Sequence, residues 1–255
     1  MSKIGFFILS ATQDLFQLET KLLVSHYKQA IHQYNLDVEI YSFVGDETVE
    51  KTYEKDGVIY CKCKDGDLCQ KHKELFAYIL ENKNYEYFLS TNTSTIVNLK
   101  QLYDTIPNLD SSCYYGVFGF LTEVKKIDTK FFYPNGNFKM FHMDMLKKLY
   151  TDFDKLHDML EETAVHENMP VGWFGVPDDI LIGLFLHINK VKIKMFNNFM
   201  RMFHFWNYPQ QNTSIPIEQA MVVQYKMPML PKDRMFPETQ LLNFIIHQIE
   251  SRWQR

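Results

Sequence analysis

The sequence lacks an excess of positive charge. Its 27 lysine and arginine residues are outnumbered by 31 aspartate and glutamate residues, which gives a formal net charge of −4 and a pI near 6.1. Proteins that bind nucleic acid or anionic membranes by general electrostatics usually carry a basic excess. Nucleic acid is therefore disfavoured as a partner, although a transferase acting on modified nucleic acid stays open.

The first residues of the sequence have few features of a targeting or membrane-spanning segment. Residues 1–14 hold a single lysine and only a short apolar run before polar residues return. That is too little for a signal peptide or a spanning helix. We expect a cytoplasmic protein with no membrane span.

Cysteine is scarce as well. The chain has four cysteines, Cys61, Cys63, Cys69 and Cys113, which is no disulfide framework for 255 residues. Cys61 and Cys63 alternate along a predicted strand and, with Cys69, could form a thiolate site. No CxxC pair or companion histidine cluster completes such a site. Reduced structural cysteines are the favoured interpretation.

Apolar residues, by contrast, are abundant. Hydrophobic residues make up 46% of the chain and aromatic residues 15%, enough for a sizeable core. Apolar runs that predict strands alternate with stretches of helical spacing. The predicted strands cover residues 3–10, 37–46 and 58–63 and the apolar run 87–89, and the predicted helices start at Asp14 and cover residues 65–82 and 98–106. This alternation predicts an α/β fold with a mixed, mostly parallel sheet flanked by helices, and places the ends of the first, second and fourth strands along one edge.

The second half of the chain is less regular. The following are predicted in order: a turn at Pro134-Asn135-Gly136, a helix over residues 142–162, an Asp178-Asp179 cap on a helix over residues 180–188, and a strand over residues 191–195. Residues 209–237 are proline-rich, polar and nearly without predicted structure, and a terminal helix follows over residues 238–253. We therefore divide the chain into one domain over residues 1–208 and a C-terminal extension over residues 209–255 that packs on it.

The most informative stretch is Tyr85–Leu99, where an apolar strand breaks into Thr-Asn-Thr-Ser-Thr at residues 91–95. In open α/β sheets, ligands bind beyond the carboxyl ends of the strands, so this loop is a candidate ligand site. The alternative is a polar turn that caps the next helix. The residues alone leave both interpretations open.

Several segments, in order, resemble inverting glycosyltransferases of the GT-A fold, particularly the fringe and β-1,3-galactosyl- and N-acetylglucosaminyltransferase group. The resemblance spans about residues 3–204. The second strand ends in FVGD, and residues 65–73 are similar to the family pattern D-S-Y-x-N-L-T-x-K-T. Residues 85–99 are similar to Y-x-Y-x-x-K-T-D-D-D-T-F-V-N-L, and residues 176–183 to P-D-D-x-T-x-G. Phe203-His204 is similar to an F-H pair late in the family sequences. The resemblance implies transfer of a sugar, of hexosyl type, from a nucleotide-diphosphate sugar to a hydroxyl of a glycan or another acceptor.

The chain departs from this family at its metal motif. Asn92-Thr93-Ser94 stands where the family has Asp-x-Asp, so no carboxylate remains there. A divalent cation that bridges a diphosphate normally needs at least one carboxylate ligand. We expect an enzyme that requires no cofactor and binds Mg²⁺ or Mn²⁺ at most weakly, with Asn92, Ser94 and His204 as the available ligands.

The resemblance also implies roles for individual residues. Asp179 would be the general base, and Asp178 would cap the helix or share acceptor contacts; the alternative is that both are only helix N-terminal residues. Trp173 and Phe174 would form an acceptor platform or a buried hydrophobic anchor. The residues implied to bind the nucleotide sugar are Ser10, Ala11, Thr12, Asp46, Lys73, Thr91, Asn92, Thr93 and Ser94.

Stabilisation of the departing diphosphate would fall to basic side chains. The candidates are Lys139, Arg201 and His204. Each has a plainer alternative, because lysine and arginine mostly lie on solvated faces and His204 could be a core histidine. The alternative function for the whole chain is a non-catalytic GT-A relative that binds a nucleotide, glycan or protein partner.

Overall fold

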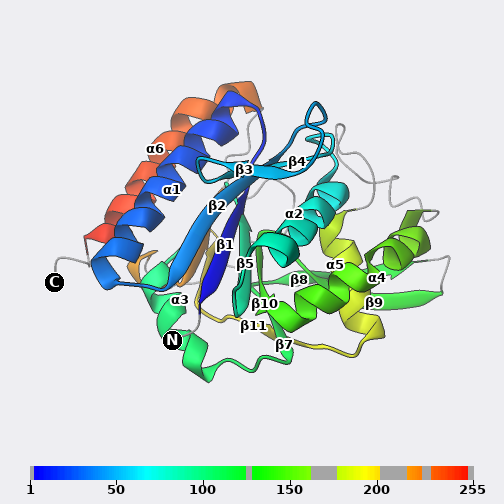
Figure 1. Ribbon diagram of the computed structural model, residues 1–255. Coiled ribbons are helices and arrows are strands. Elements are labelled where there is room, and N and C mark those ends of the chain that lie inside the picture. The colour runs from blue at the N-terminus through cyan, green and yellow to red at the C-terminus, as the bar shows by residue number, and fades with distance from the viewer. Residues whose placement is uncertain (1–2, 125–127, 162–176, 202–216, 226–230, 252–255) are drawn as a thin grey trace.

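The computed structural model of the protein describes residues 3–124, 128–161, 177–201, 217–225 and 231–251. Its centre is an eight-stranded sheet in the order β11-β7-β10-β5-β1-β2-β4-β3 (Figure 1). These strands are β1 (Ile4–Leu9), β2 (Val38–Gly45), β3 (Tyr53–Lys55), β4 (Val58–Cys61), β5 (Tyr87–Asn92), β7 (Cys113–Gly116), β10 (Phe138–His142) and β11 (Lys192–Met195). The predicted mixed, mostly parallel sheet with flanking helices is confirmed.

The register of the sheet brings several strand ends to one edge. Leu9 of β1 lies opposite Phe43 of β2 and Asn92 of β5, and both pairings are parallel. β10 runs antiparallel to β5, so its first residue, Phe138, lies opposite Thr91. The predicted alignment of the first, second and fourth strands is therefore confirmed, and the start of β10 joins the same edge.

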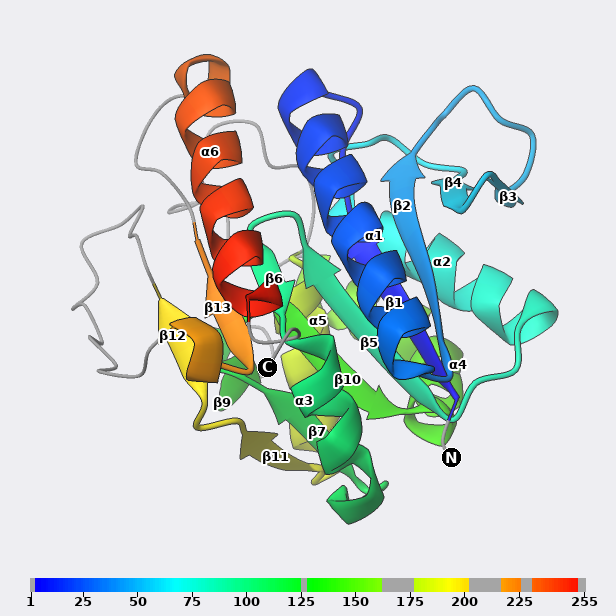
Figure 2. The ribbon, with the colours of Figure 1, turned by 90° about the vertical axis from the view of Figure 1, so that its left-hand side faces the viewer.

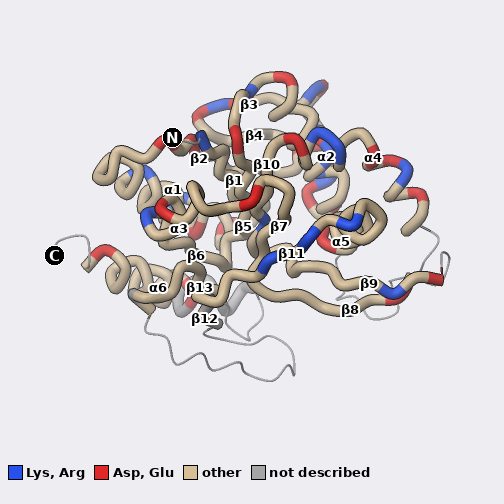
Figure 3. Tube along the Cα trace, turned by 90° about the horizontal axis from the view of Figure 1, so that it is seen from below, with Lys and Arg blue, Asp and Glu red and all other residues tan. Residues whose placement is uncertain are grey.

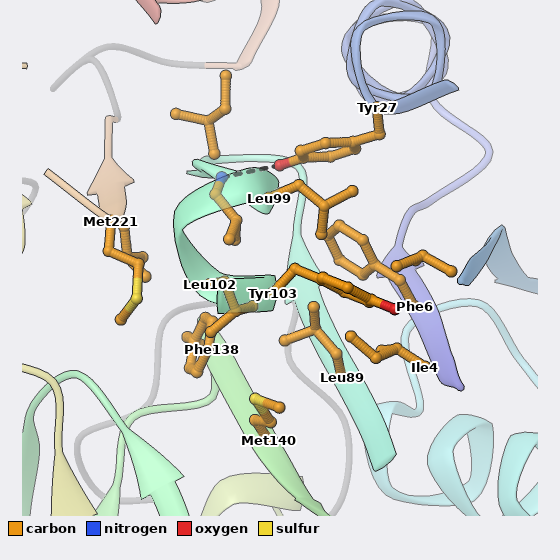
Figure 4. Packing of buried hydrophobic residues seen from close by; sticks show 14 of the residues in the cluster. Ile4, Phe6, Tyr27, Leu89, Leu99, Leu102, Tyr103, Phe138, Met140 and Met221 are labelled. Atoms are coloured by element: carbon orange, nitrogen blue, oxygen red, sulfur yellow. Dashed lines mark hydrogen bonds between the residues drawn. The ribbon is translucent and has the colours of Figure 1, made fainter. Parts of the chain in front are cut away.

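One face of the sheet is covered by α1 (Asp14–Tyr34), α3 (Leu99–Thr105) and α6 (Pro231–Glu250), with α6 alongside α1 (Figure 2). Phe6 of the sheet packs against Tyr27 of α1, with ring centroids 4.8 Å apart, and Figure 4 shows both in the same buried cluster as Leu102 of α3. The Tyr27 hydroxyl accepts a hydrogen bond from the Val97 amide at 2.9 Å. A buried polar atom is thus satisfied where two helices meet the sheet.

The opposite face is covered by α2 (Leu68–Asn82), α4 (Met143–Glu161) and α5 (Asp178–Ile188), as Figure 1 shows. Phe88 of β5 stacks with Phe7 of β1 and packs against Phe141 of β10. A separate two-stranded sheet of β8 (Gly119–Val124) and β9 (Thr129–Pro134) packs on α5. The N-termini of α2 and α5 lie at the edge of the sheet where β1, β2 and β5 end and β10 begins, which we call the functional edge.

Gly183 is where α5 touches β9 most closely. A Cβ atom built there would lie 2.3 Å from Tyr133 Cβ and 2.9 Å from Tyr133 Cα. Because a real Cβ is not found so close to backbone atoms, we expect Gly183→Ala to lower the free energy of unfolding by about 1–3 kcal/mol. Urea denaturation measures this, with Gly136→Ala as the control, since a Cβ at Gly136 would meet its neighbours at ordinary distances of 3.4 Å and above. Equal stability of the two variants would contradict this packing.

The C-terminal part of the chain corrects one expectation. Within the described residues of 209–237, the chain forms a 3-10 turn (Ile217–Gln219) and strand β13 (Val222–Gln224), and α6 already begins at Pro231. β13 pairs with β6 (Thr95–Val97) and β12 (Phe199–Arg201). A strand this short has too few residues for a recognisable period, and proline is well suited to the first position of a helix.

The turn at Pro134–Gly136 is present but does not form a hairpin. β9 ends at Pro134 and pairs with β8, while β10 pairs with β5 and β7. The turn is therefore a corner that leads the chain from the small sheet to the functional edge.

The cysteines agree with the sequence-based expectation of reduced, structural thiols. Figure 3 shows acidic and basic residues interspersed along the chain in that view, with basic residues along β11. All four cysteines are buried and free, and burial raises the pKa of Cys63 to about 12. No helix in the described part of the chain is long and apolar enough to cross a membrane.

Candidate functional site

A cavity of about 170 Å³ lies at the carboxyl ends of β1 and β5. Both strands and the start of α2 contribute to its wall. The lining residues are Leu9, Ser10, Ala11, Phe16, Asp65, Leu68, Lys71, Asn92, Thr93 and Ser94. The structure thus brings together two separate sequence segments that were predicted to bind a nucleotide sugar, residues 10–11 and 92–94.

An ion pair between Asp65 and Lys71 forms one wall of this cavity. The Lys71 ammonium lies 2.6 Å from Asp65 and 3.3 Å from the Ser10 carbonyl, and the Lys71 side chain is 1% exposed. Asp65 also accepts hydrogen bonds from the backbone amides of Thr12 and Gly45. Burial opposes ionisation of Asp65, but Lys71 and these amides outweigh it and lower its pKa. The pair therefore ties the ends of β1 and β2 to α2.

Lys71 is a residue that the family comparison missed, because the motif spacing pointed to Lys73. Lys73 instead faces outward and forms an ion pair of 2.5 Å with Asp154 of α4. The two lysines point in different directions because residues two apart on a helix lie about 200° from each other. The signal that could have found Lys71 is its spacing of four from Leu75, which places it on the buried face of α2.

The loop after β5 is shaped by Asn92. Its side-chain oxygen accepts hydrogen bonds from the Ser94 amide, the Ser94 hydroxyl and the Thr95 hydroxyl, at 2.9–3.2 Å. Its side-chain nitrogen donates to Asn137 at 2.5 Å. The loop does not cap the next helix, since β6 intervenes and Asn98 caps α3. Asn92 is thus committed to the shape of the loop.

A cluster of four ionisable groups lies next to the cavity. Asp178 is 2.6 Å from the Lys139 ammonium and 3.5 Å from His72 Nδ1. Lys139 also donates to the Gly136 carbonyl at 3.1 Å and lies 3.3 Å from His72 Nε2. Asp179 is the neighbour of Asp178 in the first turn of α5. The predicted cap is wrong, because Pro177 occupies the N-cap position and no side chain caps the helix.

The charges in this cluster differ sharply between the two aspartates. Burial raises the pKa of Asp179, and the Asp178 charge raises it further, to about 7. Burial would also raise the pKa of Asp178, but Lys139 and His72 outweigh it and lower that pKa. Burial, aided by Lys139, lowers the pKa of His72 to about 4. At neutral pH the cluster therefore holds an ionised Asp178, a neutral His72 and an Asp179 that can gain or lose a proton.

The cavity and the cluster are joined by two short links. Lys71 and His72 are consecutive residues of α2; Lys71 faces the cavity and His72 faces the ionisable cluster. Asn92 bonds to Asn137, and the adjacent Gly136 lies against Asp179, since a Cβ there would be 3.5 Å from Asp179 Cβ. Asp179 is half-buried and lies next to this region without lining the cavity itself.

Other predicted residues lie apart from this group or are used differently. Asp46 does not line the cavity, and hydrogen bonds from Thr48 lower its pKa. The Ser10 hydroxyl bonds to Thr20 of α1 at 2.7 Å, so Ser10 offers the cavity no free hydroxyl. Thr91 is buried in β5, and its hydroxyl has no hydrogen-bond partner in the described structure.

The remaining candidates fall where the structure says little. Arg201 ends β12, but its side chain is outside the described residues. Trp173, Phe174 and His204 also lie outside them. Their predicted roles stay predictions.

No family model matches the sequence, and no curated protein matches it. Solved structures do match. The galactosyltransferase LgtC, in complex with donor and acceptor sugar analogues, aligns over 95% of this chain and 95% of its own, with a TM-score of 0.54 and 14% identity. The apo form of the glycosyltransferase GlyE from Streptococcus pneumoniae TIGR4 aligns over 99% of this chain and 64% of its own, with a TM-score of 0.50 and 13% identity. The chain has the GT-A glycosyltransferase fold.

The GT-A fold confirms the broad part of the sequence resemblance. Both similar proteins are glycosyltransferases, but at such low identity the likeness concerns the fold. The fringe-like subgroup stays a prediction.

The family motif implies a divalent metal at the carboxyl ends of the strands. Within the described ranges, no group of three or more His, Cys, Asp or Glu side chains could bind a metal ion. The Asn92 oxygen already accepts hydrogen bonds within its loop, and Asp65 is neutralised by Lys71. The side chains described at the cavity do not fit a divalent cation, which prefers carboxylate oxygens.

Proposed function

We propose that this chain is a glycosyltransferase that moves a sugar from a nucleotide-diphosphate sugar to an acceptor hydroxyl, with Asp179 as the general base. One observation carries the proposal: a half-buried carboxyl group whose pKa is raised to about 7 lies beside a cavity at the strand ends of a GT-A fold. A base works best when its pKa is near the working pH. Perturbed carboxyl groups in such places are candidates for catalysis.

The proposed reaction is a single displacement. The acceptor oxygen attacks C1 of the donor sugar while its proton passes to the Asp179 carboxylate. The bond between C1 and the diphosphate oxygen breaks, and its electron pair leaves with the nucleoside diphosphate. Attack from the face opposite the leaving group inverts the configuration at C1.

We propose that the donor occupies the cavity and that transfer needs little or no divalent metal. The commitment of Asn92 to its own loop supports this, as does the pairing of Asp65 with Lys71. Basic side chains would then stabilise the developing diphosphate charge. Arg201 and His204 are the candidates for this role, because Lys139, which was also predicted for it, is buried and paired with Asp178.

Thermal unfolding with a panel of nucleotide sugars and nucleoside diphosphates, in EDTA and in Mn²⁺, tests the proposal. A donor at one hundred times its Kd should stabilise the protein by about 2.7 kcal/mol, in EDTA as well as in Mn²⁺. Ala11→Phe, which fills part of the cavity, should remove the shift. The proposal is wrong if no nucleotide shifts the transition and no nucleotide sugar is consumed.

Stabilisation by a nucleotide without turnover would instead support a non-catalytic GT-A relative. The absence of every carboxylate from residues 92–94 favours this second function. Assays for sugar transfer with the donors that bind separate the two.

A further inference from the structure

The face of the sheet beneath α2 and α5 is aromatic, except at the residue pair nearest the functional edge. Phe88 and Phe141 lie opposite each other, and the next pair toward the functional edge on this face is Ser90 and Lys139. Lys139 is 1% exposed. A buried ammonium is costly unless it is paired and hydrogen-bonded. The residues that satisfy Lys139 therefore show what it does.

Lys139 is fixed by contacts from three parts of the chain. They are Asp178 at 2.6 Å, the Gly136 carbonyl at 3.1 Å, and His72 Nε2 at 3.3 Å. His72 Nδ1 lies 2.9 Å from the Leu68 carbonyl, which can only accept. The Nδ1 atom therefore carries the proton, and Nε2 is free to accept from Lys139.

The two aspartates differ in their contacts. Asp178 is 6% exposed and faces the Lys139 ammonium. Asp179 has no cation of its own in the described structure; its carboxylate accepts the Ile180 amide at 3.0 Å. Two adjacent carboxylates that share one counter-ion do not ionise equally.

We propose that Lys139 and His72 are positioning residues that hold Asp178 as an ionised carboxylate beside Asp179. The fixed negative charge of Asp178 makes Asp179 the proton acceptor of the pair. The inference rests on the proposed function, because it assigns how the base of that reaction is set. His72 fixes Lys139, Lys139 fixes Asp178, and only Asp179 meets the substrate.

The other groups facing the pair do not compete for the proton. On β7, Tyr114 is 1% exposed, and its hydroxyl has no hydrogen-bond partner among the described residues. Burial, together with the two aspartate charges, raises its pKa far above the usual range. Burial likewise raises the pKa of Cys69 on α2. Both groups stay protonated at neutral pH, so the exchangeable proton belongs to the aspartates.

Carboxyl NMR titration of the full chain with ¹³C-labelled aspartate tests this without any substrate. In the wild type we expect one carboxyl signal with a midpoint near pH 7, missing in Asp179→Asn, and a second that stays ionised to below pH 4, missing in Asp178→Asn. Asp178→Asn should also move the Asp179 midpoint down by about one pH unit or more, because the neighbouring charge is gone. The proposal is overturned if both wild-type signals titrate below about pH 5, or if Asp178→Asn leaves the Asp179 midpoint unchanged.

Two further variants test the positioning residues. Lys139→Met should raise the Asp178 midpoint by about one to three pH units. His72→Gln, whose amide oxygen can still accept from Lys139, should raise the Asp178 midpoint less than His72→Leu does, because both variants lose the imidazolium charge and only His72→Gln keeps the acceptor. Equal midpoints in His72→Gln and His72→Leu would exclude His72 from the arrangement. Since these titrations need no donor, they can succeed even in a protein that transfers no sugar, and a failed titration does not depend on the transfer assay.

Discussion

Asp179→Asn is expected to lower the rate of sugar transfer by about 10²–10⁴-fold and to stabilise the protein at pH 8. The rate falls because the amide cannot accept the acceptor proton. The stability rises because the pKa of Asp179 is about 7 in the folded protein, above the ordinary value of about 3.9. The folded state binds the proton more tightly, so its stability falls as the pH rises from about 4 to 7.

At pH 8 Asp179 is ionised in the wild type, and this ionisation of a half-buried carboxyl group lowers the free energy of unfolding. The neutral asparagine of Asp179→Asn does not lower it. Because Asp179 is partly exposed, we expect the amide to stabilise the protein by about 1–3 kcal/mol at this pH. Urea denaturation at pH 4 and pH 8 measures the effect, which should be near zero at pH 4. Asp178→Asn is the matched control and should destabilise the protein at pH 8, because it leaves Lys139 buried without its counter-ion. Retained transfer by Asp179→Asn would exclude Asp179 as the base.

Lys71→Met is expected to lower the free energy of unfolding by about 2–4 kcal/mol. Removing one partner of a buried ion pair costs about 3–5 kcal/mol, and the Asp65 side chain, at 24% exposed, regains some water. The substitution also removes the link between α2 and the Ser10 carbonyl. Urea denaturation at neutral pH measures the loss.

Lys73→Met is the matched control on the same helix. Its partner Asp154 is 75% exposed, and exposed pairs contribute less than about 1 kcal/mol. The double variant Lys71→Met/Asp65→Asn should recover part of the loss, because no unpaired charge is then left. If the two lysine variants are equally stable, the Asp65–Lys71 pair does not stabilise the contact between α2 and the ends of β1 and β2.

Much of the fold could be predicted because its signals are local. The buried runs of β1 and β5 and the helical spacing in α2 and α4 depend on a few neighbouring residues, and the observed elements follow them closely. β6 and β13 could not be predicted in the same way. Each is a three-residue strand that forms because it pairs with a distant segment. Their stability comes from a partner that the local sequence does not contain.

Candidate site residues show the same division. The alternation of strands and helices predicted that the ends of the first and fourth strands, at Ser10 and Asn92, would lie at one edge, and both residues line the cavity. The motif spacing selected Lys73, yet Lys71 lies at the cavity. A spacing taken from another family does not record which side of a helix meets the sheet.

The sequence by itself determined the alternation of strands and helices, the polar loop without acids at residues 92–94, and the two adjacent aspartates before an apolar helix. These are properties of neighbouring residues. Only the tertiary structure decided that Lys139 and His72 meet Asp178, and that Asp179 forms no ion pair with a cation among the described residues. The physical reason is that a carboxyl pKa depends on burial and on charges brought near it through space, and these groups come from α2, β10 and α5, far apart in the chain.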